Sequence, residues 1–324
     1  MDSQRIQRLS NCVSVLETIE KHGMISRKQI SDETGLSLMT VGKLCAFLEE
    51  CELISEKKED KSESGRKASI CSLTDSCSPY IMNCADNTYL FTARGPLGGP
   101  DVSIMHSASD DIGFEDKLFQ FCDRMNDMLE RIAHIPTDAV CMVSDAKEDS
   151  GILTAIDGSK ADIRRIAQKL CRNAKYSIFS PAAAAAAYLE KNSDEPSVAA
   201  VIGKTLSFAV TDSNSVRYSA SAIYPNALRA DGVSLGERLL MMGTPDKEGV
   251  FAFLCALHAF FPDRCIVLFP LSESNGALTC GELCRYAISA AGIEDNCRTC
   301  EDPLGAISEG ARLMYITNLL KKHI

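Results

Sequence analysis

Residues 14–54 read SVLETIEKHGMISRKQISDETGLSLMTVGKLCAFLEECELI, and the pattern of this stretch predicts three helices joined by short connections. Apolar residues at helical spacing follow Ser10-Asn11, so we expect a first helix that starts there and ends at the stop signal Lys21-His22-Gly23. The residues that follow this stretch predict a small hairpin, and the rest of the chain predicts a larger α/β domain.

The second and third helices are delimited by capping residues. Ser26 is placed to cap a short helix over 27–34, and Gly35 is placed to end it in the left-handed conformation. Ser37 then caps a third helix that extends to about Cys51. Two short helices separated by a glycine-containing turn are typical of a helix-turn-helix, which presents its second helix to the major groove of DNA.

A hairpin follows the third helix. Residues 53–57 and 67–73 have strand-like patterns, and the polar connection between them contains the turn Ser64-Gly65. A hairpin directly after a recognition helix is a wing, and a cationic loop tip can follow phosphates or enter the minor groove. We therefore expect a winged helix-turn-helix in residues 1–75, with these DNA-contacting residues: Arg27, Ser37, Met39, Thr40, Lys43, Arg66 and Lys67.

An interpretation of the same residues without DNA binding stays open. Three helices with a hairpin also form protein-interaction modules, and charge at a loop tip is commonly only solvated. Residues 1–75 carry 11 Lys and Arg against 13 Asp and Glu, and the whole chain has a formal charge of −10. Contact with DNA therefore depends on the placement of a few cations rather than on bulk charge. Gly42 lowers the helix propensity of the third helix by roughly 1 kcal/mol relative to alanine, which suggests either close approach of DNA or a helix crossing.

Composition places the 324-residue chain among ordinary globular proteins with room for two or three domains. No apolar stretch follows a basic N-terminus, and the longest apolar run, 250–261, is shorter than the roughly 20 residues that span a bilayer. The 15 cysteines are scattered and odd in number, as in a protein from a reducing compartment. We expect a cytoplasmic protein without a membrane partner.

The segment 14–54 followed by SGRKASICSL at 64–73 resembles the DNA-binding part of the ROK family (repressors, open reading frames and kinases). The regulators of that family carry a winged helix ahead of a sugar-kinase-like domain. The matching positions are Ser26-Arg27, Gly35-Leu36-Ser37, Thr40-Val41 and Gly65-Arg66.

Beyond residue 76 strand-like and helix-like segments alternate, which favours a layered α/β domain of two lobes. The order of these segments resembles the ROK domain, a member of the actin-like (ribonuclease H-like) ATPase fold. We expect three units: a winged helix-turn-helix over 1–75, a first lobe over 76–190 and a second lobe over 191–324.

The resemblance does not extend to the catalytic chemistry of that family. Where the family has Asp-Gly-Thr after the first strand, this sequence has Asn83-Cys84-Ala85, without a glycine that would let the backbone approach a phosphate. Where the family places its catalytic Asp, Ser180-Pro181-Ala182 offers no group that can remove a proton. The second phosphate loop, 203–208, retains one glycine. The sequence therefore predicts no catalytic residues, no cofactor and no enzyme activity.

The ROK zinc motif has no counterpart near 224–236. Cys280, Cys284, Cys297 and Cys300 have spacings that a tetrahedral thiolate site uses, yet ordinary buried thiols are the favoured interpretation. Asp145, Asp149 and Asp157 are expected in a solvated polar loop.

These observations predict a transcriptional regulator, expected to be a repressor, that binds a palindromic operator in double-stranded DNA as a homodimer. Its ROK-like domain would serve dimerisation and sensing, and the sequence does not identify a small-molecule effector. The alternatives are a sugar kinase of the ROK family with an appended winged helix, and an interaction scaffold that uses both folds without DNA.

Overall fold

The winged helix is formed as the sequence predicts, with an additional strand. The computed structural model describes residues 3–58, 69–85, 88–95, 101–107, 112–155, 158–193, 195–203, 206–212, 215–222, 229–230, 233–234, 247–271 and 280–323. In the N-terminal part the elements are α1 (Ser3–His22), β1 (Met24–Ser26), α2 (Arg27–Thr34), α3 (Leu38–Glu50), β2 (Ile54–Lys58) and β3 (Ser69–Leu73).

Two details of this domain differ from the prediction. Helix α1 begins at Ser3 rather than after Asn11, and Leu9 extends its buried stripe toward the N-terminus. Strand β1, in the expected turn between the first two helices, pairs antiparallel with β3, giving a three-stranded sheet of order β1-β3-β2. Three residues are too few for an alternating pattern to show in the sequence.

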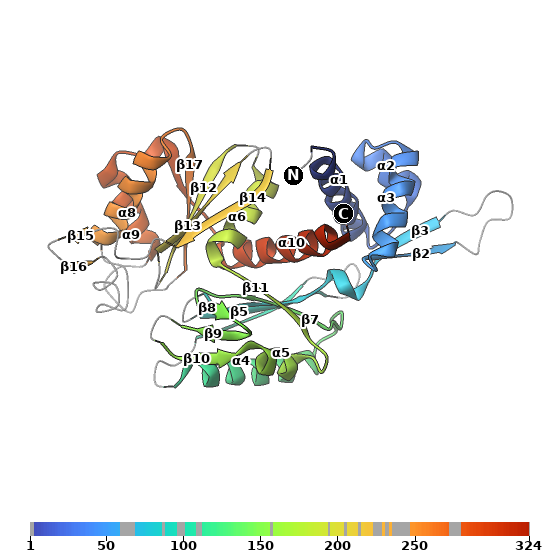
Figure 1. The fold of residues 1–324 in the computed structure, drawn as a ribbon, viewed down its shortest axis with the longest axis horizontal. Helices are drawn as coiled ribbons and strands as arrows, with labels where there is room; N and C mark the ends of the chain where they lie inside the picture. Colours follow the sequence, from blue (N-terminus) through green and yellow to red (C-terminus); the bar gives the residue numbers. More distant parts are fainter. Residues whose placement is uncertain are drawn as a thin grey trace.

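Two five-stranded sheets that share the same topology form the larger domain (Figure 1). The first sheet has the order β11-β7-β4-β5-β6. Its strands are β4 (Tyr80–Asn83), β5 (Thr88–Ala93), β6 (Val102–Ser107), β7 (Ala139–Val143) and β11 (Lys175–Phe179). The second sheet has the order β14-β13-β12-β17-β18. Its strands are β12 (Ser197–Ile202), β13 (Leu206–Asp212), β14 (Ser215–Ala222), β17 (Cys265–Pro270) and β18 (Cys297–Thr299).

In each sheet the first three strands form an antiparallel meander, and the last two run parallel to its first strand. The helices repeat in the same order. They are α4 (Phe114–Leu129), α5 (Ile163–Leu170) and α6 (Pro181–Asn192) in the first half, and α8 (Lys247–Phe260), α9 (Cys280–Ala291) and α10 (Pro303–His323) in the second. The expected class, a winged helix followed by a two-lobed α/β domain, is confirmed.

The third helix of each half packs against the sheet of the other half. Helix α6 packs on β12, β13 and β14, whereas α10 packs on β4 and β7, and the two helices lie against each other. The expected boundary at residue 190 therefore divides the sequence, but in space each lobe uses the last helix of the other. The contact is very close, since a Cβ at Gly310 would stand 1.8 Å from the carbonyl oxygen of Ala184.

Three apolar cores follow from this arrangement. One lies between the first sheet and α4 and α5, and another between the second sheet and α8 and α9. The central core joins the opposite faces of both sheets to α6, α10 and the winged helix. Figure 1 shows α10 extending from the region between the sheets to α1, so that one helix contacts all three parts of the protein.

Short strands account for most of the other differences from the prediction. The expected polar loop around Asp145 and Asp149 contains the hairpin of β8 (Lys147–Asp149) and β9 (Ile152–Thr154), to which β10 (Lys160–Asp162) adds. Ser150 and Gly151 both have positive φ, as a two-residue hairpin turn requires. Asp157 lies outside the described residues. Strands β15 (Arg229–Ala230) and β16 (Val233–Ser234) form a two-residue ladder.

No helix in the described ranges has both the length and the apolar character of a membrane span.

Candidate functional site

Hydrogen bonds fix the angle between α2 and α3. Ser26 and Gln29 form a reciprocal capping box at the start of α2, and Gly35, with φ 69°, ends the helix with its amide donating to the carbonyl of Ser31. The Ser31 hydroxyl donates to the carbonyl of Leu36 across the turn at 2.6 Å. Ser37 then caps α3 by accepting a hydrogen bond from the amide of Thr40 at 3.1 Å.

Helix α3 has one buried and one exposed face. The buried face packs in the central core and consists of Val41, Leu44, Cys45, Phe47 and Leu48. On the other face Lys43 is exposed, Met39 is 71% exposed and Leu38 is 56% exposed. The N-terminal end of α3 therefore presents a lysine and two uncovered apolar side chains to a partner.

Ser37 and Thr40 lie at the start of this surface but are partly used by the helix itself. Their hydroxyl oxygens are 2.8 Å apart, and Ser37 also caps the backbone. Of the seven residues predicted to contact DNA, the structure thus brings together Ser37, Met39, Thr40 and Lys43. Leu38 belongs to the same exposed end and is absent from the prediction.

Arg27 holds the domain together instead of extending freely into solvent. It is the first residue of α2, and its guanidinium forms an ion pair with Glu56 of β2. A Cβ at Gly42 of α3 would make only an ordinary contact, 3.7 Å from Arg27 Nη1. No helix crossing therefore requires Gly42, and close approach of DNA remains the other expectation for that glycine.

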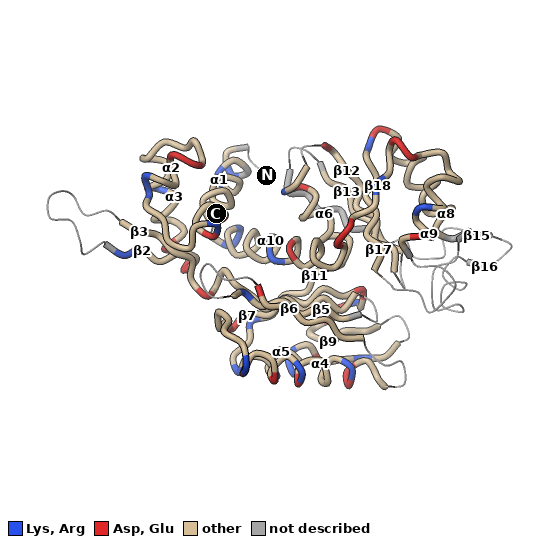
Figure 2. Tube along the Cα trace, turned by 180° about the vertical axis from the view of Figure 1, so that it is seen from behind, with Lys and Arg blue, Asp and Glu red and all other residues tan. Residues whose placement is uncertain are grey.

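The wing is formed by β2 and β3, which pair antiparallel from Ile54–Leu73 to Lys58–Ser69. Arg66 and Lys67, predicted at the tip of the wing, lie outside the described residues. Figure 2 shows basic and acidic segments together in the region of α2 and α3. Both helices carry charges of both signs: α2 has Arg27, Lys28, Asp32 and Glu33, and α3 has Lys43, Glu49 and Glu50.

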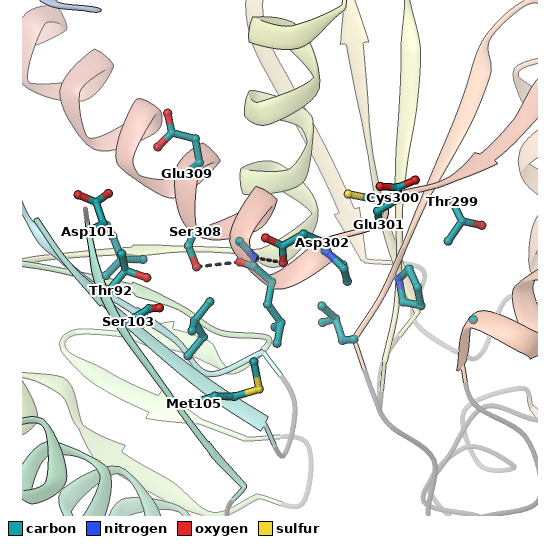
Figure 3. Close-up of a pocket in the computed structure, with 18 of the residues that line it drawn as sticks. Thr92, Asp101, Ser103, Met105, Thr299, Cys300, Glu301, Asp302, Ser308 and Glu309 are labelled. Carbon is teal, nitrogen blue, oxygen red and sulfur yellow. Dashed lines mark hydrogen bonds between the residues drawn. The ribbon is translucent and has the colours of Figure 1, made fainter. Parts of the chain in front are cut away.

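A cleft of about 1140 Å³ separates the two lobes, and we call it the interlobe cleft. Figure 3 shows Thr92, Ser103 and Met105 of the first sheet on one side, and the segment 299–302 with Ser308 of α10 on the other. Among the described residues, the charged ones that line it are Asp101, Arg285, Glu301, Asp302, Glu309 and Arg312. This described part of the lining, with four carboxylates and two guanidiniums, suits a ligand rich in hydroxyl or amino groups.

Asn83 and Ser180-Pro181-Ala182, where the resemblance to the ROK family would place catalytic groups, have structural roles here. Asn83 is fully buried, and its side-chain amide donates to the carbonyl of Leu304 at 3.3 Å, which joins β4 to the start of α10. Ser180 caps α6 by accepting from the amide of Ala183, and Ala182 is buried in the first turn. Neither position offers a proton acceptor to the interlobe cleft. The second loop is described only in part, because residues 204 and 205 lie outside the described ranges.

The cysteines considered for zinc do not form a site within the described ranges. Cys284 and Cys297 are buried, burial raises the pKa of Cys297 to about 12, and a metal would need its thiolate. The side chain of Cys280 is not described. Among the residues that the structure describes, no three His, Cys, Asp or Glu side chains are grouped as metal ligands would be.

An ionic cluster connects the interlobe cleft to α1. Arg312 of α10 donates to both carboxylate oxygens of Glu20, at 2.8 and 3.1 Å, and to both of Glu309, at 2.9 and 2.8 Å. Glu20 also pairs with Arg94, which bonds Asp101 at 3.1 Å. Lys191 of α6 joins Glu309 at 3.0 Å to Glu17 of α1 at 3.2 Å.

Three members of the ionic cluster also line the interlobe cleft, namely Asp101, Glu309 and Arg312. The side chain of Arg312 is 9% exposed and that of Glu20 is 14% exposed, so this contact is largely removed from solvent. Sequence inspection could not find the cluster, because Glu20 and Arg312 are 292 residues apart in the chain.

The amino-acid sequence matches no protein-family model and no curated protein. Among solved structures, a ROK family transcriptional regulator described as a homolog of the E. coli MLC protein is similar to the chain. It has 13% identity and a TM-score of 0.58, and the alignment covers 99% of each chain. This likeness shows a shared fold.

Two further solved structures are more distant. A ROK family glucokinase from Streptomyces griseus in complex with glucose and AMPPNP has 11% identity and a TM-score of 0.49, over 73% of this chain and 98% of the glucokinase. A ROK family protein from Streptococcus pneumoniae TIGR4 in complex with sucrose has 12% identity and a TM-score of 0.45, over 75% of this chain and 99% of that protein.

Proposed function

We propose that the protein is a DNA-binding transcriptional regulator of the ROK type, acting as a repressor, with α3 placed in the major groove. The observation that carries this proposal is the exposed N-terminal end of α3, where Met39 is 71% exposed beside an exposed Lys43. The N-terminal residues of a recognition helix are those that reach base edges. A lysine there can bond guanine, and a methionine can contact a thymine methyl group.

The full-length likeness to a structure named as a transcriptional regulator supports the same proposal. We assign base contacts to Met39 and Lys43 and phosphate contacts to Arg66 and Lys67. Ser37 and Thr40 would contact the backbone while holding the start of α3. Arg27 would reach a phosphate only in competition with Glu56, so its substitution is expected to affect the stability of the domain as well.

The test is a selection from sheared genomic DNA with the full-length protein, followed by affinity measurements on the most enriched fragment. Replacing Arg66 and Lys67 with alanine should weaken binding several-fold for all sequences and reduce the salt slope by about 0.9 for each phosphate that is no longer neutralised. Lys43→Ala should instead change which bases are preferred, at a cost of about 1–3 kcal/mol at the affected position.

Lys160→Ala is the matched control, because Lys160 is an exposed lysine of β10 in the larger domain. It should leave both affinity and salt slope unchanged. Failure to enrich any fragment at low and at moderate salt would contradict the proposal.

We also propose a homodimer that reads a palindromic operator. Light scattering on the full chain measures the mass of the particle and checks this proposal.

We further propose that occupancy of the interlobe cleft controls the winged helix through the ionic cluster. A ligand that bonds Asp101, Glu309 or Arg312 competes with their contacts to the cluster, and Arg312 holds α1 through Glu20. An effector shifts an equilibrium only by its differential affinity for two states. The cluster provides a physical basis for such a difference between a docked and a released winged helix.

The alternative, a sugar kinase with an appended winged helix, is opposed by the roles of Asn83 and Ala182. Phosphoryl transfer depends on positioned backbone amides, a metal and a group that orients the nucleophile. Calorimetric titration with magnesium-ATP and a coupled assay over hexoses and amino sugars distinguish the two functions. We expect no turnover, and turnover that Asp145→Ala abolishes would establish the kinase instead.

A further inference from the structure

Two cysteines of the winged helix face each other between α3 and the wing. Cys45 lies on α3 and Cys71 on β3, and their sulfur atoms are 3.9 Å apart. Both side chains are buried, at 1% and 0% exposure. We call them the thiol pair.

The surroundings of the thiol pair differ from those of the other buried thiols. Cys77 and Cys122 donate to backbone carbonyls, and burial raises the pKa of each to about 12. The thiol pair lies beside the Arg27 guanidinium. The contact with Cys45, helped by Arg27, lowers the pKa of Cys71 even though burial and Glu56 oppose this, while the same contact raises the pKa of Cys45. The sulfur–sulfur contact and the Arg27 guanidinium thus favour the thiolate at Cys71 and the proton at Cys45.

The polar groups beside the thiol pair are incompletely satisfied. Within the described part of the chain, Nε of Arg27 and Oε1 of Glu56 are buried and have no hydrogen-bond partner. Buried polar atoms normally have one, and a redox or catalytic role is one of the explanations for an exception. An unused guanidinium donor next to a thiol favours the negative charge that develops when that thiol reacts.

We propose that the thiol pair is a redox-sensitive site, in which Cys45 and Cys71 form a reversible disulfide upon reaction with a hydroperoxide. The Cys71 thiolate attacks the peroxide and becomes a sulfenic acid, releasing hydroxide or an alkoxide. The Cys45 thiol then displaces the sulfenic oxygen as water, and the S–S bond forms. The net reaction consumes two thiols and one hydroperoxide and yields one disulfide, one water and one further water or alcohol.

The disulfide would change the geometry of the DNA-contacting elements, and this consequence rests on the proposed function. A disulfide holds its sulfur atoms about 2.05 Å apart, so the sulfurs must approach from 3.9 Å. Cys45 is on the helix that presents Met39 and Lys43, and Cys71 is on a strand of the wing. Oxidation would therefore shift the recognition helix relative to the wing and weaken contacts that need both.

The first experiment maps the disulfide in the full-length protein after hydrogen peroxide treatment, by differential alkylation and mass spectrometry. Trypsin leaves Cys45 with Cys51 in peptide 44–57, and Cys71 with Cys77 and Cys84 in 68–94. A second protease that cleaves after Leu48 and Leu73 separates them. We expect a Cys45–Cys71 cross-link that dithiothreitol reverses. If both thiols remain reduced while exposed thiols are oxidised, or if Cys71 overoxidises without a cross-link, the proposal is wrong.

The second experiment measures affinity for the DNA fragment most enriched from the genomic library, before and after peroxide. Oxidation should weaken wild-type binding at least tenfold, with recovery in dithiothreitol. Cys45→Ser and Cys71→Ser should each change less than twofold on treatment. The control Cys77→Ser removes a buried thiol of the neighbouring segment and should respond like the wild type. Equal sensitivity of Cys71→Ser, or a mapped disulfide without loss of affinity, would overturn the regulatory role. If the reduced protein binds no DNA, the proposed function fails, while the mapping still decides whether the disulfide exists.

Discussion

At the scale of single residues, Ser37 and Gly310 show how small side chains position helices in this structure. Ser37 determines where α3 begins, and Gly310 determines how closely α10 approaches α6. The capping role of Ser37 could be predicted from sequence because it depends on neighbours three residues away. The role of Gly310 could not, because the atom that excludes a side chain there belongs to Ala184.

Gly310→Ala is expected to lower the free energy of unfolding by at least about 2 kcal/mol, since overpacked cores cost typically 1–3 kcal/mol and this obstacle is backbone. Urea unfolding at neutral pH measures the loss. Gly305→Ala is the control, because its added Cβ would meet the flexible carboxylate of Asp302, 2.1 Å away. That variant should stay within about 1 kcal/mol of the wild type. Equal losses in the two variants would contradict the close helix contact.

At the scale of elements, the ionic cluster joins α1, α6 and α10. Burial opposes ionisation of Glu309, but Arg312 and Lys191 outweigh it and hold the pKa of Glu309 at about 2, below its usual 4.5. Folding therefore favours the ionised carboxylate. The resulting stabilisation is complete above about pH 4.5 and disappears as the pH falls toward 2.

Glu309→Gln should therefore remove about 2 kcal/mol of stability at pH 7, given roughly 1.4 kcal/mol per pKa unit and a side chain that is partly exposed. Its stability should also fall less than that of the wild type between pH 4.5 and 3. Chemical unfolding at several pH values measures both effects. Glu301→Gln, at an exposed position in the interlobe cleft, is the control and should follow the wild-type curve. A parallel acid dependence in Glu309→Gln would show that the cluster does not stabilise the ionised carboxylate.

Elements with a complete local signal were predicted well, and short edge strands were not. The bounds of α2 match the expected helix over 27–34, because capping residues delimit it. Strand β6 was not predicted, although its side chains alternate between half-buried and exposed. Strands β8, β9, β10 and β18 have three residues each, and such lengths give no period to recognise.

The candidate site was predictable to a similar extent. The helix-turn-helix and the exposed residues of α3 follow from local pattern. The pairing of Arg27 with Glu56, the thiol pair and the ionic cluster depend on which elements meet, and this is decided by tertiary packing.

At the scale of the whole molecule, the winged helix is continuous with the larger domain. The central core includes Leu16 of α1 and Ile316 of α10. In addition, Glu20 of α1 pairs with the buried Arg312 of α10. The domains should therefore unfold together in the wild type.

Glu20→Gln should separate that single thermal transition into two, because it leaves the buried charge of Arg312 without one of its two carboxylates. Breaking such a pair costs on the order of 3–5 kcal/mol. Differential scanning calorimetry of the full chain makes the measurement. Glu33→Gln is the control, since Glu33 pairs with Lys21 and His22 inside the winged helix and should leave one transition. A single transition at the wild-type temperature in Glu20→Gln would disprove the coupling.

The position of α10 has a consequence for biosynthesis. This helix is translated after every element that it packs on, and it supplies partners for Glu20 and Asn83, which are 292 and 221 residues earlier in the chain. A nascent polypeptide can form its helix-turn-helix early, from local contacts, but cannot dock it on the larger domain until α10 leaves the ribosome. Until then the apolar faces of α1, α6 and the first sheet stay open to water or to chaperones. Translation that terminates before residue 303 would release a chain whose helix-turn-helix is folded and whose larger domain is incomplete.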